Sequence, residues 1–306
     1  MKWKFKALTQ QVFSHVPLGE NMNYFAQKYV TRSLPVDKNA FLNKVAEAKR
    51  NLDAFSHHGP TNSDRGQLVF YEFGARWDMI VPLSYYLMGI RHQILIDIRP
   101  LVRLELINDS IAKFQRYSSD VQTILSAGAD AGSRLAQVDS VKQIKEQFGI
   151  EYRAPCDARD THIGAGTIDF ISSTATLEHI PAKDILPIFN ECYRILGDGG
   201  IMTCYIGYYD HYSYFDLSIT PYNFYQYSSS AWRLFNCSLH YQNRLRHKDF
   251  VNMIQDTRFS IAEDVPTAPT PADMRALETV RLHSDFKQDY QAADLAIQTG
   301  FFVLKK

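Results

Sequence analysis

Two acids at the ends of neighbouring hydrophobic runs have the spacing that best predicts chemistry in this sequence. Glu72 stands near the end of the run 68–74, and Asp97 closes the run 93–97, 25 positions after Glu72. In a doubly wound sheet, ligands bind beyond the carboxyl ends of the strands, and an acid that closes the second strand can accept both hydroxyls of a ribose. Gly74 allows the backbone to approach such a ligand closely. The sequence therefore predicts a ligand site where these two runs end.

The turn after the first run indicates which class of ligand the site prefers. A dinucleotide site favours a Gly-x-Gly-x-x-Gly turn whose helix amides face a pyrophosphate. Here Gly74 is followed by Arg76 and Asp78 instead of further glycines, and Glu72 precedes it. Because an acidic turn attracts a cation better than a phosphate, we expect a cationic ligand.

Hydrophobic periodicity predicts the elements that position these residues. Residues 1–58 have helical spacing, and the Gly- and Pro-containing segment 57–64 is the best candidate boundary. Strands and helices then alternate, which indicates parallel strands joined by crossover helices. The predicted strands are 68–74, 93–97, 150–153, 167–172, 201–206, 260–265 and 300–304, and the predicted helices are 79–88, 104–117, 138–148, 182–196, 248–255 and a stretch after Pro271. Residues 197–200 are expected to form the turn that ends the helix 182–196.

The composition excludes several classes of protein. The chain has 306 residues, with 33 Lys and Arg against 33 Asp and Glu, and 45% of its residues are hydrophobic. Such a chain can bury a core, so disorder and disulfide scaffolds are excluded, and the zero net charge argues against a nucleic-acid partner. The four cysteines follow no zinc-binding spacing. No HExxH motif or other metal-ligand cluster occurs in the sequence, so metal dependence is not supported.

The N-terminal segment and the most apolar run indicate no targeting or spanning element. Polar residues interrupt the stretch after the first lysines, and the run 79–90 is shorter than the roughly 20 apolar residues of a membrane span. We therefore expect a cytoplasmic protein. Lys2, Lys4 and Lys6 alternate with Trp3 and Phe5, which predicts either a peripheral membrane contact or a solvated arm that packs through its aromatic residues.

The ordered set of motifs resembles the class I S-adenosylmethionine-dependent methyltransferases from about residue 69 to the C-terminus. The matching segments are Glu72–Asp78, Ile96-Asp97, Asp157-Ala158, Thr167–Ser172, Leu177-Glu178-His179-Ile180-Pro181 and Glu191–Gly200. The resemblance implies an α/β fold with a Rossmann-like, doubly wound, mostly parallel seven-stranded sheet and a final antiparallel strand. It also implies an N-terminal helical arm (1–64) and a methyltransferase domain (65–306) that carries a helical insertion (103–148).

Carried over residue by residue, the resemblance implies how S-adenosyl-L-methionine is bound. Gly74 approaches its methionine part while Glu72 organises that loop, and Asp97 holds the ribose diol. The residues expected at the adenine and at the opposite side of the cofactor are Asp157, Ala158 and Thr174. Carboxylates suit a sulfonium cation and neutral hydroxyl and amino donors. Arg76 and Asp78 depart from the family, which usually has glycines there, and Arg76 puts a positive charge near the sulfonium.

The acceptor side is expected after the fifth strand, where Tyr and Phe are dense between residues 207 and 228. Asp210 and His211 are the best acid/base pair for removing a hydroxyl proton, although adjacent residues in a strand point to opposite faces. An aromatic lid with a surface histidine is an equally good interpretation. His179 is a further catalytic candidate, though a histidine packed at a helix start is commoner. The substrate-binding candidates are Tyr222 and Arg244, and a solvated helix cap is the alternative for Arg244.

These observations together predict methyl transfer to a small-molecule or saccharide acceptor, through a hydroxyl oxygen. The N-terminal arm and the segment 29–35 resemble bacterial methyltransferases of surface polysaccharide and glycolipid assembly, which favours a saccharide. Two alternatives remain: a non-catalytic scaffold with a degenerate cofactor pocket, and a nicotinamide-dependent oxidoreductase. The oxidoreductase would need the glycine spacing that Arg76 and Asp78 interrupt. The insertion is either a lid or a dimer surface, so a homodimer is also predicted.

Overall fold

A seven-stranded sheet in the order β3-β2-β1-β4-β5-β7-β6 organises the computed structural model, which describes residues 2–16, 19–61, 64–126 and 131–306. The first five strands pair in parallel, whereas β7 is antiparallel to both β5 and β6. The strands are β1 (Val69–Phe73), β2 (His92–Ile96), β3 (Ile150–Arg153), β4 (Ile168–Thr174), β5 (Leu196–Gly207), β6 (Ser260–Pro266) and β7 (Thr299–Lys305). The doubly wound sheet with its final antiparallel strand confirms the predicted fold class.

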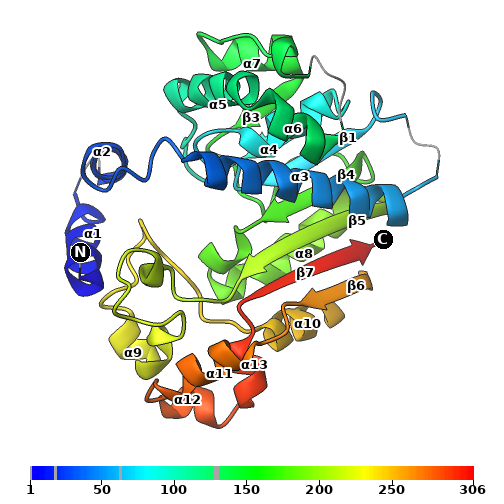
Figure 1. Ribbon diagram of the computed structural model, residues 1–306. Helices are drawn as coiled ribbons and strands as arrows, with labels where there is room; N and C mark the ends of the chain where they lie inside the picture. Colours follow the sequence, from blue (N-terminus) through cyan, green and yellow to red (C-terminus); the bar gives the residue numbers. More distant parts are fainter. Residues whose placement is uncertain (1, 17–18, 62–63, 127–130) are drawn as a thin grey trace.

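Helices that precede β3 cover one face of the sheet (Figure 1). They are α3 (Lys38–His58), α4 (Ile80–Leu87), α5 (Leu104–Arg116), α6 (Ser118–Leu125) and α7 (Val141–Phe148). The longest, α3, packs Phe41, Val45 and Phe55 into this core, where Phe55 lies 5.1 Å from the Phe170 ring of β4. Within the predicted arm 1–64, the segment α3 therefore belongs to the core of the sheet.

The opposite face is covered by α8 (Ala182–Ile195) and α10 (His247–Gln255). Successive strand residues point to opposite faces, so Phe70 enters the first core whereas Tyr71 enters the second. Both residues are completely buried. A sheet covered on both faces holds its strand ends rigidly, which suits side chains that must be positioned for chemistry.

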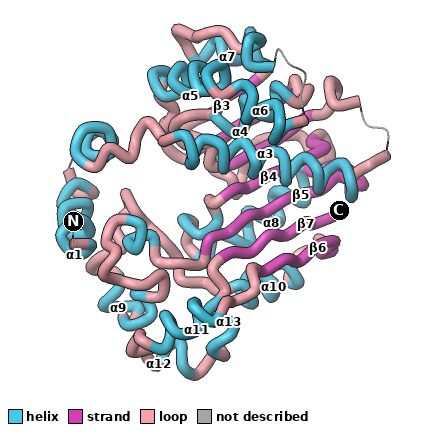
Figure 2. The backbone as a smooth tube through the Cα atoms, in the orientation of Figure 1, coloured by secondary structure: helices cyan, strands magenta, loops and turns pink. Residues whose placement is uncertain are grey.

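The N-terminal arm packs against the segment that follows β5 (Figures 1 and 2). Its elements are α1 (Trp3–Phe13), α2 (Gly19–Phe25) and the π-helix η1 (Ala26–Val30). Trp3 is buried among aromatic rings, with Phe235 at 4.9 Å and Tyr212 at 5.3 Å between ring centroids. Lys6 is also buried, and the loss of solvent lowers its pKa to about 7. The arm thus packs through an aromatic residue, as one of its two interpretations predicted.

A third buried hydrophobic cluster, rich in aromatic residues, packs against the N-terminal arm and includes several short helices. These are η5 (Asn223–Gln226), α9 (Ser229–Trp232), α11 (Pro271–Glu278), α12 (Ser284–Lys287) and α13 (Ala292–Ala296). The 3-10 helix η2 (Ala131–Arg134) completes the insertion, and two more, η3 (Leu177–His179) and η4 (His211–Tyr214), follow β4 and β5. Among the described residues, no helix is long and apolar enough to cross a membrane.

One predicted boundary was wrong. Residues 197–200 do not form a turn after α8, because β5 begins at Leu196, which pairs with Ile168 of β4. The register of β4 and β5 shifts between Ile168 and Phe170, and Gly199 adopts a positive φ of 76° in that irregular stretch. Glycines tolerate the irregular backbone of a bulge, which allows the strand to begin there. The residues that predicted a turn therefore lie inside a strand.

Candidate active site

The carboxyl ends of β1, β2, β4 and β5 bring the predicted functional residues to one edge of the sheet. Glu72 lies in β1, Asp97 follows β2, Thr174 ends β4, and His211 begins η4 after β5. Because these strands are parallel, their ends share this edge, which is where doubly wound sheets bind ligands. The structure therefore gathers at one edge residues that lie far apart in the sequence.

Glu72 is a buried carboxyl whose hydrogen-bonding capacity is not used up. Glu72 is only 4% exposed to solvent, and its Oε2 has no hydrogen-bond partner in the described part of the chain. Burial raises the pKa of Glu72 to about 8, although the positive charge of Arg76 opposes the shift. An unpartnered buried oxygen is costly unless a ligand satisfies it, so this atom is suited to a donor or a cation.

Asp97 is nearly buried and already accepts one hydrogen bond. The Tyr152 hydroxyl donates to its Oδ2 at 3.0 Å, and the backbone N–H of Arg76 also donates to this carboxyl. Burial raises the pKa of Asp97 to about 7, and these hydrogen bonds hold it lower than burial alone would. Tyr152 thereby fixes the orientation of the carboxylate predicted to hold a diol, a role the sequence did not reveal.

Gly74 occupies a conformation and a contact that exclude a side chain. Its φ is +81°, and a Cβ on it would lie 2.4 Å from Cγ2 of Thr176. Its amide donates to the carbonyl of Ile96 at 2.9 Å, which ties the turn after β1 to the end of β2. The glycine is therefore required where the two loops approach each other.

Arg76 fills the position that the family usually gives to a glycine, with φ at 65°. Its guanidinium donates to the carbonyl of Thr174 at 3.2 Å and to that of Ala175, so the side chain crosses from the end of β1 to the end of β4. There its charge lowers the pKa values of Glu47, Glu72 and Asp97, each of which burial raises. Arg76 is thus an internal cation among buried acids.

A small cavity lies beside Arg76, between α3 and the loop after β1. Its lining residues are Lys44, Glu47, Glu72, Gly74, Ala75, Arg76, Asp78, Ile80, Val81, Pro82 and Thr174. Asp78, the second departure from the family, accepts from Lys44 Nζ at 2.6 Å. Thr174 Oγ1 accepts from the Asn51 side chain at 3.2 Å. Helix α3 therefore contributes to the site, which hydrophobic spacing alone did not indicate.

Asp157 and Ala158, predicted at the adenine, lie beyond β3. Arg159 donates to both carboxylate oxygens of Asp157, to Oδ1 at 3.0 Å and to Oδ2 at 2.6 Å. These hydrogen bonds lower the pKa of Asp157. Arg159 also pairs with Asp184 of α8 at 2.7 Å. Asp157 accepts an adenine amino group only if one of these bonds is exchanged.

Across the same edge, Glu178 and His179 of η3 lie beside His211. The rings of His179 and His211 are 4.9 Å apart between centroids. Glu178 is 1% exposed and its Oε1 accepts from the Gly207 amide at 3.3 Å, whereas its Oε2 has no partner in the described part of the chain. Burial raises the pKa of Glu178 to about 7 and lowers those of His179, to about 4, and of His211. These shifts favour the neutral form of both imidazoles.

Asp210 does not orient His211. Its carboxylate accepts from the Tyr212 amide at 2.9 Å and from Asn223 Nδ2 at 2.8 Å, so it caps η4. A turn does follow β5, as an Asp210–His211 pair would require. It points the Asp210 carboxylate toward Tyr212 and Asn223 rather than toward His211. The ring of His240 also lies near His211, at 6.2 Å between centroids.

The two predicted substrate-binding residues have structural contacts instead. Tyr222 is 1% exposed in the third cluster and donates to the carbonyl of Ala296 at 3.0 Å. Arg244 donates to the carbonyls of Phe224 and Tyr227, at 3.1 and 2.5 Å. Neither the phenol nor the guanidinium faces the acids and histidines, because both hold the aromatic segment after β5 in place.

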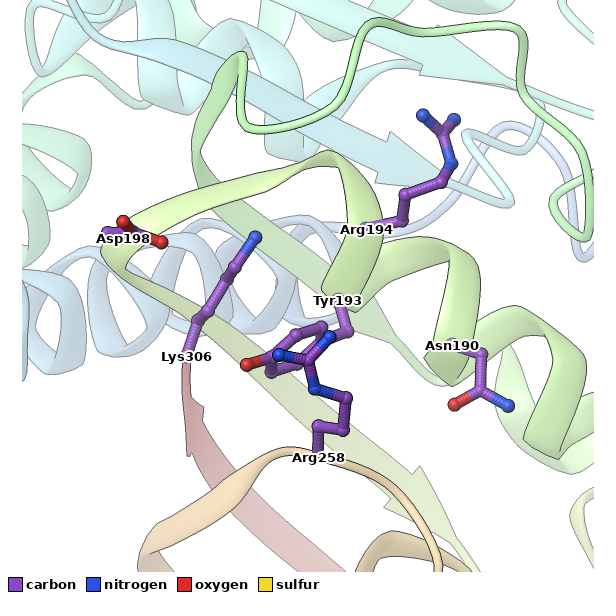
Figure 3. Close-up of a pocket in the computed structure, with 6 residues that line it drawn as sticks. All are labelled: Asn190, Tyr193, Arg194, Asp198, Arg258 and Lys306. Atoms are coloured by element: carbon purple, nitrogen blue, oxygen red, sulfur yellow. The ribbon is translucent and has the colours of Figure 1, made fainter.

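A hollow of about 470 Å³ lies at the opposite, amino edge of the sheet (Figure 3). It is lined by Asn190, Tyr193, Arg194, Asp198, Arg258 and Lys306. Arg194 pairs with Glu191 at 2.7 Å, and Lys306 donates to the carbonyl of Leu196. Because its cations have internal partners and the hollow lies away from the carboxyl ends of the strands, we assign the chemistry to the other edge.

Comparisons with known proteins indicate what this chain is similar to. Residues 122–204, which include β3, β4 and most of β5, match a family model described as a methyltransferase domain. This segment is therefore similar to a methyltransferase domain. The match supports the predicted methyltransferase over the nicotinamide-dependent oxidoreductase. A search of the curated proteins gave no match.

Solved structures of methyltransferases are similar to this chain at low identity. Geranyl diphosphate C-methyltransferase from Streptomyces coelicolor A3(2) is 11% identical with a TM-score of 0.45, covering 89% of this chain and 85% of that one. An S-adenosylmethionine-dependent methyltransferase from Mesorhizobium loti is 12% identical with a TM-score of 0.43, covering 87% and 100%. Phosphoethanolamine N-methyltransferase 2 from Haemonchus contortus is 17% identical with a TM-score of 0.44, covering 84% and 52%. At these values the acceptor has to be argued from the site itself.

Proposed function

We propose that this methyltransferase methylates a hydroxyl oxygen of a small molecule, with a saccharide as the favoured acceptor class. The observation that carries the proposal is the pairing of two neutral imidazoles with the buried acids at one strand edge. His179 and His211 face the end of β5, while Glu72 and Asp97 lie at β1 and β2. One side thus suits a cationic cofactor, and the other suits an acceptor that must lose a proton.

The residues present fit S-adenosylmethionine, as the unpartnered Oε2 of Glu72 and the side-chain-free approach at Gly74 indicate. Asp97 would hold the ribose diol in the orientation that Tyr152 fixes. Bound there, the cofactor supplies a methyl group on a sulfonium. Arg76 opposes the sulfonium electrostatically, so its guanidinium would have to withdraw from the carbonyls of β4 or tolerate a nearby cation.

On the acceptor side, His211 is suited to take the hydroxyl proton. Its Nε2 is buried and has no partner in the described part of the chain. An imidazolium formed there would lie beside the Glu178 carboxyl, which would stabilise the charge. The remaining contribution is alignment, because holding two reactants in line replaces a bimolecular encounter by a unimolecular step.

The aromatic residues around His211 support a saccharide acceptor. Tyr209 lies 5.1 Å and Tyr214 lies 5.9 Å from the His211 ring, centroid to centroid. The hydroxyl of Tyr214, a residue 64% exposed, donates to that of Tyr209. Aromatic faces with phenolic hydroxyls suit sugar rings, whereas a phosphate-rich acceptor would favour unpaired Arg and Lys.

The broader setting of the activity remains predicted from the sequence. A role in polysaccharide assembly, a cytoplasmic location, a homodimer and a peripheral membrane contact all belong to this proposal. For the membrane contact, Lys2, Lys4 and Phe5 are exposed on α1 while Lys6 is buried. Only part of the basic pattern is therefore presented to a bilayer.

Ligand binding tests the cofactor half of this proposal. We expect S-adenosylmethionine and S-adenosylhomocysteine to raise the melting temperature and to bind by calorimetry, with no effect of NAD. Incubation of the enzyme with cell extracts, followed by mass spectrometry, should then reveal a product heavier by one methylene that is labile to ether cleavage. A methylated carbon or nitrogen in that product would contradict the hydroxyl acceptor while leaving the methyl transfer intact.

A further inference from the structure

Three metal-ligating side chains meet at the ends of β4 and β5. Glu178, His179 and His211 each offer one ligand atom, and these atoms lie within 4.8 Å of one another. They come from η3 and η4, two short helices that begin just after adjacent parallel strands. Ligands around one tetrahedral ion, with metal–ligand distances of roughly 2.0–2.2 Å, lie about 3.4 Å apart, so these side chains would have to move closer together to share an ion.

Two of the three side chains carry a buried polar atom without a partner in the described part of the chain. Oε2 of Glu178 and Nε2 of His211 make no hydrogen bond with any described residue, although each is inaccessible to solvent. Glu178 as a whole is 1% exposed. Buried polar atoms are nearly always satisfied by protein, water or an ion. The coincidence of two such atoms in one cluster points to a missing ligand between them.

The third ligand is oriented by a backbone carbonyl. Nδ1 of His179 lies 2.7 Å from the carbonyl oxygen of Tyr241. Because a carbonyl only accepts, Nδ1 must carry the proton, which leaves the Nε2 lone pair free. A histidine that donates from one ring nitrogen to a carbonyl and coordinates with the other is the usual arrangement of a metal-binding histidine.

We propose that Glu178, His179 and His211 bind one divalent transition-metal ion. Two imidazoles and one carboxylate favour Zn²⁺, Fe²⁺, Co²⁺ or Mn²⁺ over Mg²⁺ and Ca²⁺, which prefer oxygen ligands throughout. Three protein ligands leave at least one coordination position open. The rings of Tyr209 and Tyr214 lie beside His211, so an acceptor held near the ion would meet this aromatic segment.

The charges around this cluster set its expected affinity. Arg76 and Lys6 act on it electrostatically as cations, whereas the acids Glu47 and Glu72 lie on the cofactor side. His240 adds a further unpartnered ring nitrogen close to His211. Because nearby positive charge opposes a bound cation, we expect binding weaker than that of closed structural zinc sites.

The role of the ion rests on the proposed methyl transfer, while its binding does not. An acceptor hydroxyl in the open position would have its pKa lowered by the ion and would release its proton to solvent water. The oxygen–carbon bond then forms as the carbon–sulfur bond of the sulfonium breaks, and the neutral thioether leaves. In this form of the reaction His211 coordinates the ion rather than accepting the proton, and it positions the acceptor only through the ion.

Titration with Co²⁺ alone tests the site without any substrate. The wild-type protein, freed of metal, should bind one equivalent and develop visible absorption bands typical of nitrogen and oxygen coordination. The variants Glu178→Gln and His211→Ala should each weaken binding at least tenfold. His92→Ala, an exposed histidine at the far edge of the sheet, is the matched control and should bind as the wild type does. Circular dichroism of each metal-free variant checks that it has folded.

Three outcomes decide the proposal. Loss of Co²⁺ binding in Glu178→Gln and His211→Ala, but not in His92→Ala, supports it. A wild-type protein that takes up no Co²⁺ or Zn²⁺ overturns it, as does uptake that the two variants leave unchanged. Calorimetry with S-adenosylmethionine on the metal-free protein tests the proposed methyl transfer separately from the metal site. A protein that binds S-adenosylmethionine but no metal would reject the metal site alone. A protein that binds metal but no S-adenosylmethionine would reject the methyl transfer alone.

Discussion

The two halves of the edge of the sheet at the carboxyl ends of the parallel strands differ in their electrostatics. At β1 and β2, buried acids lie near a permanent cation, the Arg76 guanidinium, in the region proposed to bind the cofactor. At β4 and β5, neutral imidazoles lie beside the buried acid Glu178. Both halves hold a buried carboxyl oxygen without a hydrogen-bond partner in the described part of the chain, Oε2 of Glu72 and Oε2 of Glu178. The halves differ in what lies beside that oxygen, a permanent cation in the first and imidazoles in the second.

The largest expected effect concerns the acceptor half. His211→Ala should lower kcat by about 100-fold, because the variant loses either the base or the metal ligand. Cofactor affinity should stay within about twofold, since His211 lies away from β1 and β2. Steady-state kinetics and calorimetry on the same preparation measure both values. A parallel loss of cofactor binding would show that the two halves are not separate.

The next effect concerns the cofactor half. Asp97→Ala should weaken S-adenosylmethionine binding by about 30-fold, because two hydrogen bonds from a diol to a carboxylate are lost. Asp139→Ala removes an exposed carboxylate from the loop before α7 and serves as the control. Calorimetric titration gives both constants. Normal binding by Asp97→Ala would mean that the ribose lies elsewhere.

The pH dependence of stability tests the buried acid at β1. The pKa of Glu72 is about 8 in the folded protein, whereas an exposed glutamate has a pKa of roughly 4.3. Between these values the folded state holds more protons than the unfolded state, so the free energy of unfolding falls as pH rises from about 4.5 to 8. Glu72→Gln should remove that slope and be more stable than wild type by about 2 kcal/mol at pH 8.

Urea denaturation at pH 5, 6, 7 and 8 measures this difference. Glu146→Gln, an exposed helix position, is the control and should follow the wild-type curve. A Glu72→Gln difference that does not grow with pH would indicate that the carboxyl is ionised and paired with Arg76 throughout.

The smallest effect concerns the internal cation. Arg76→Gly should tighten S-adenosylmethionine binding by about fivefold while changing S-adenosylhomocysteine binding less, because only the former carries a sulfonium charge. Arg76→Lys keeps the charge and should leave the ratio of the two constants near the wild-type value. If Arg76→Gly weakens both ligands equally, the guanidinium contributes to the pocket rather than opposing the cofactor.

The fold could be predicted because its signals are local. Hydrophobic runs and the turn residues between them located all seven strands, and β3 has the predicted bounds. The error at residues 197–200 arose because glycines permit both a turn and a strand bulge, and only the pairing of Leu196 with Ile168 decides between them. The positions of Glu72 near the end of β1 and of Asp97 after β2 also agree with the strand signals in the sequence.

The sequence by itself determined the parallel sheet, the acids at its first two strand ends and the departure at Arg76. The tertiary structure alone decided which polar groups remain open. Arg244 and Tyr222 proved to be bound to backbone carbonyls, and Asp210 caps its own helix. Glu178, in contrast, meets His179 and His211 with an oxygen to spare. The reason is physical: residue type sets what an atom can bind, but burial and partners decide whether it still can.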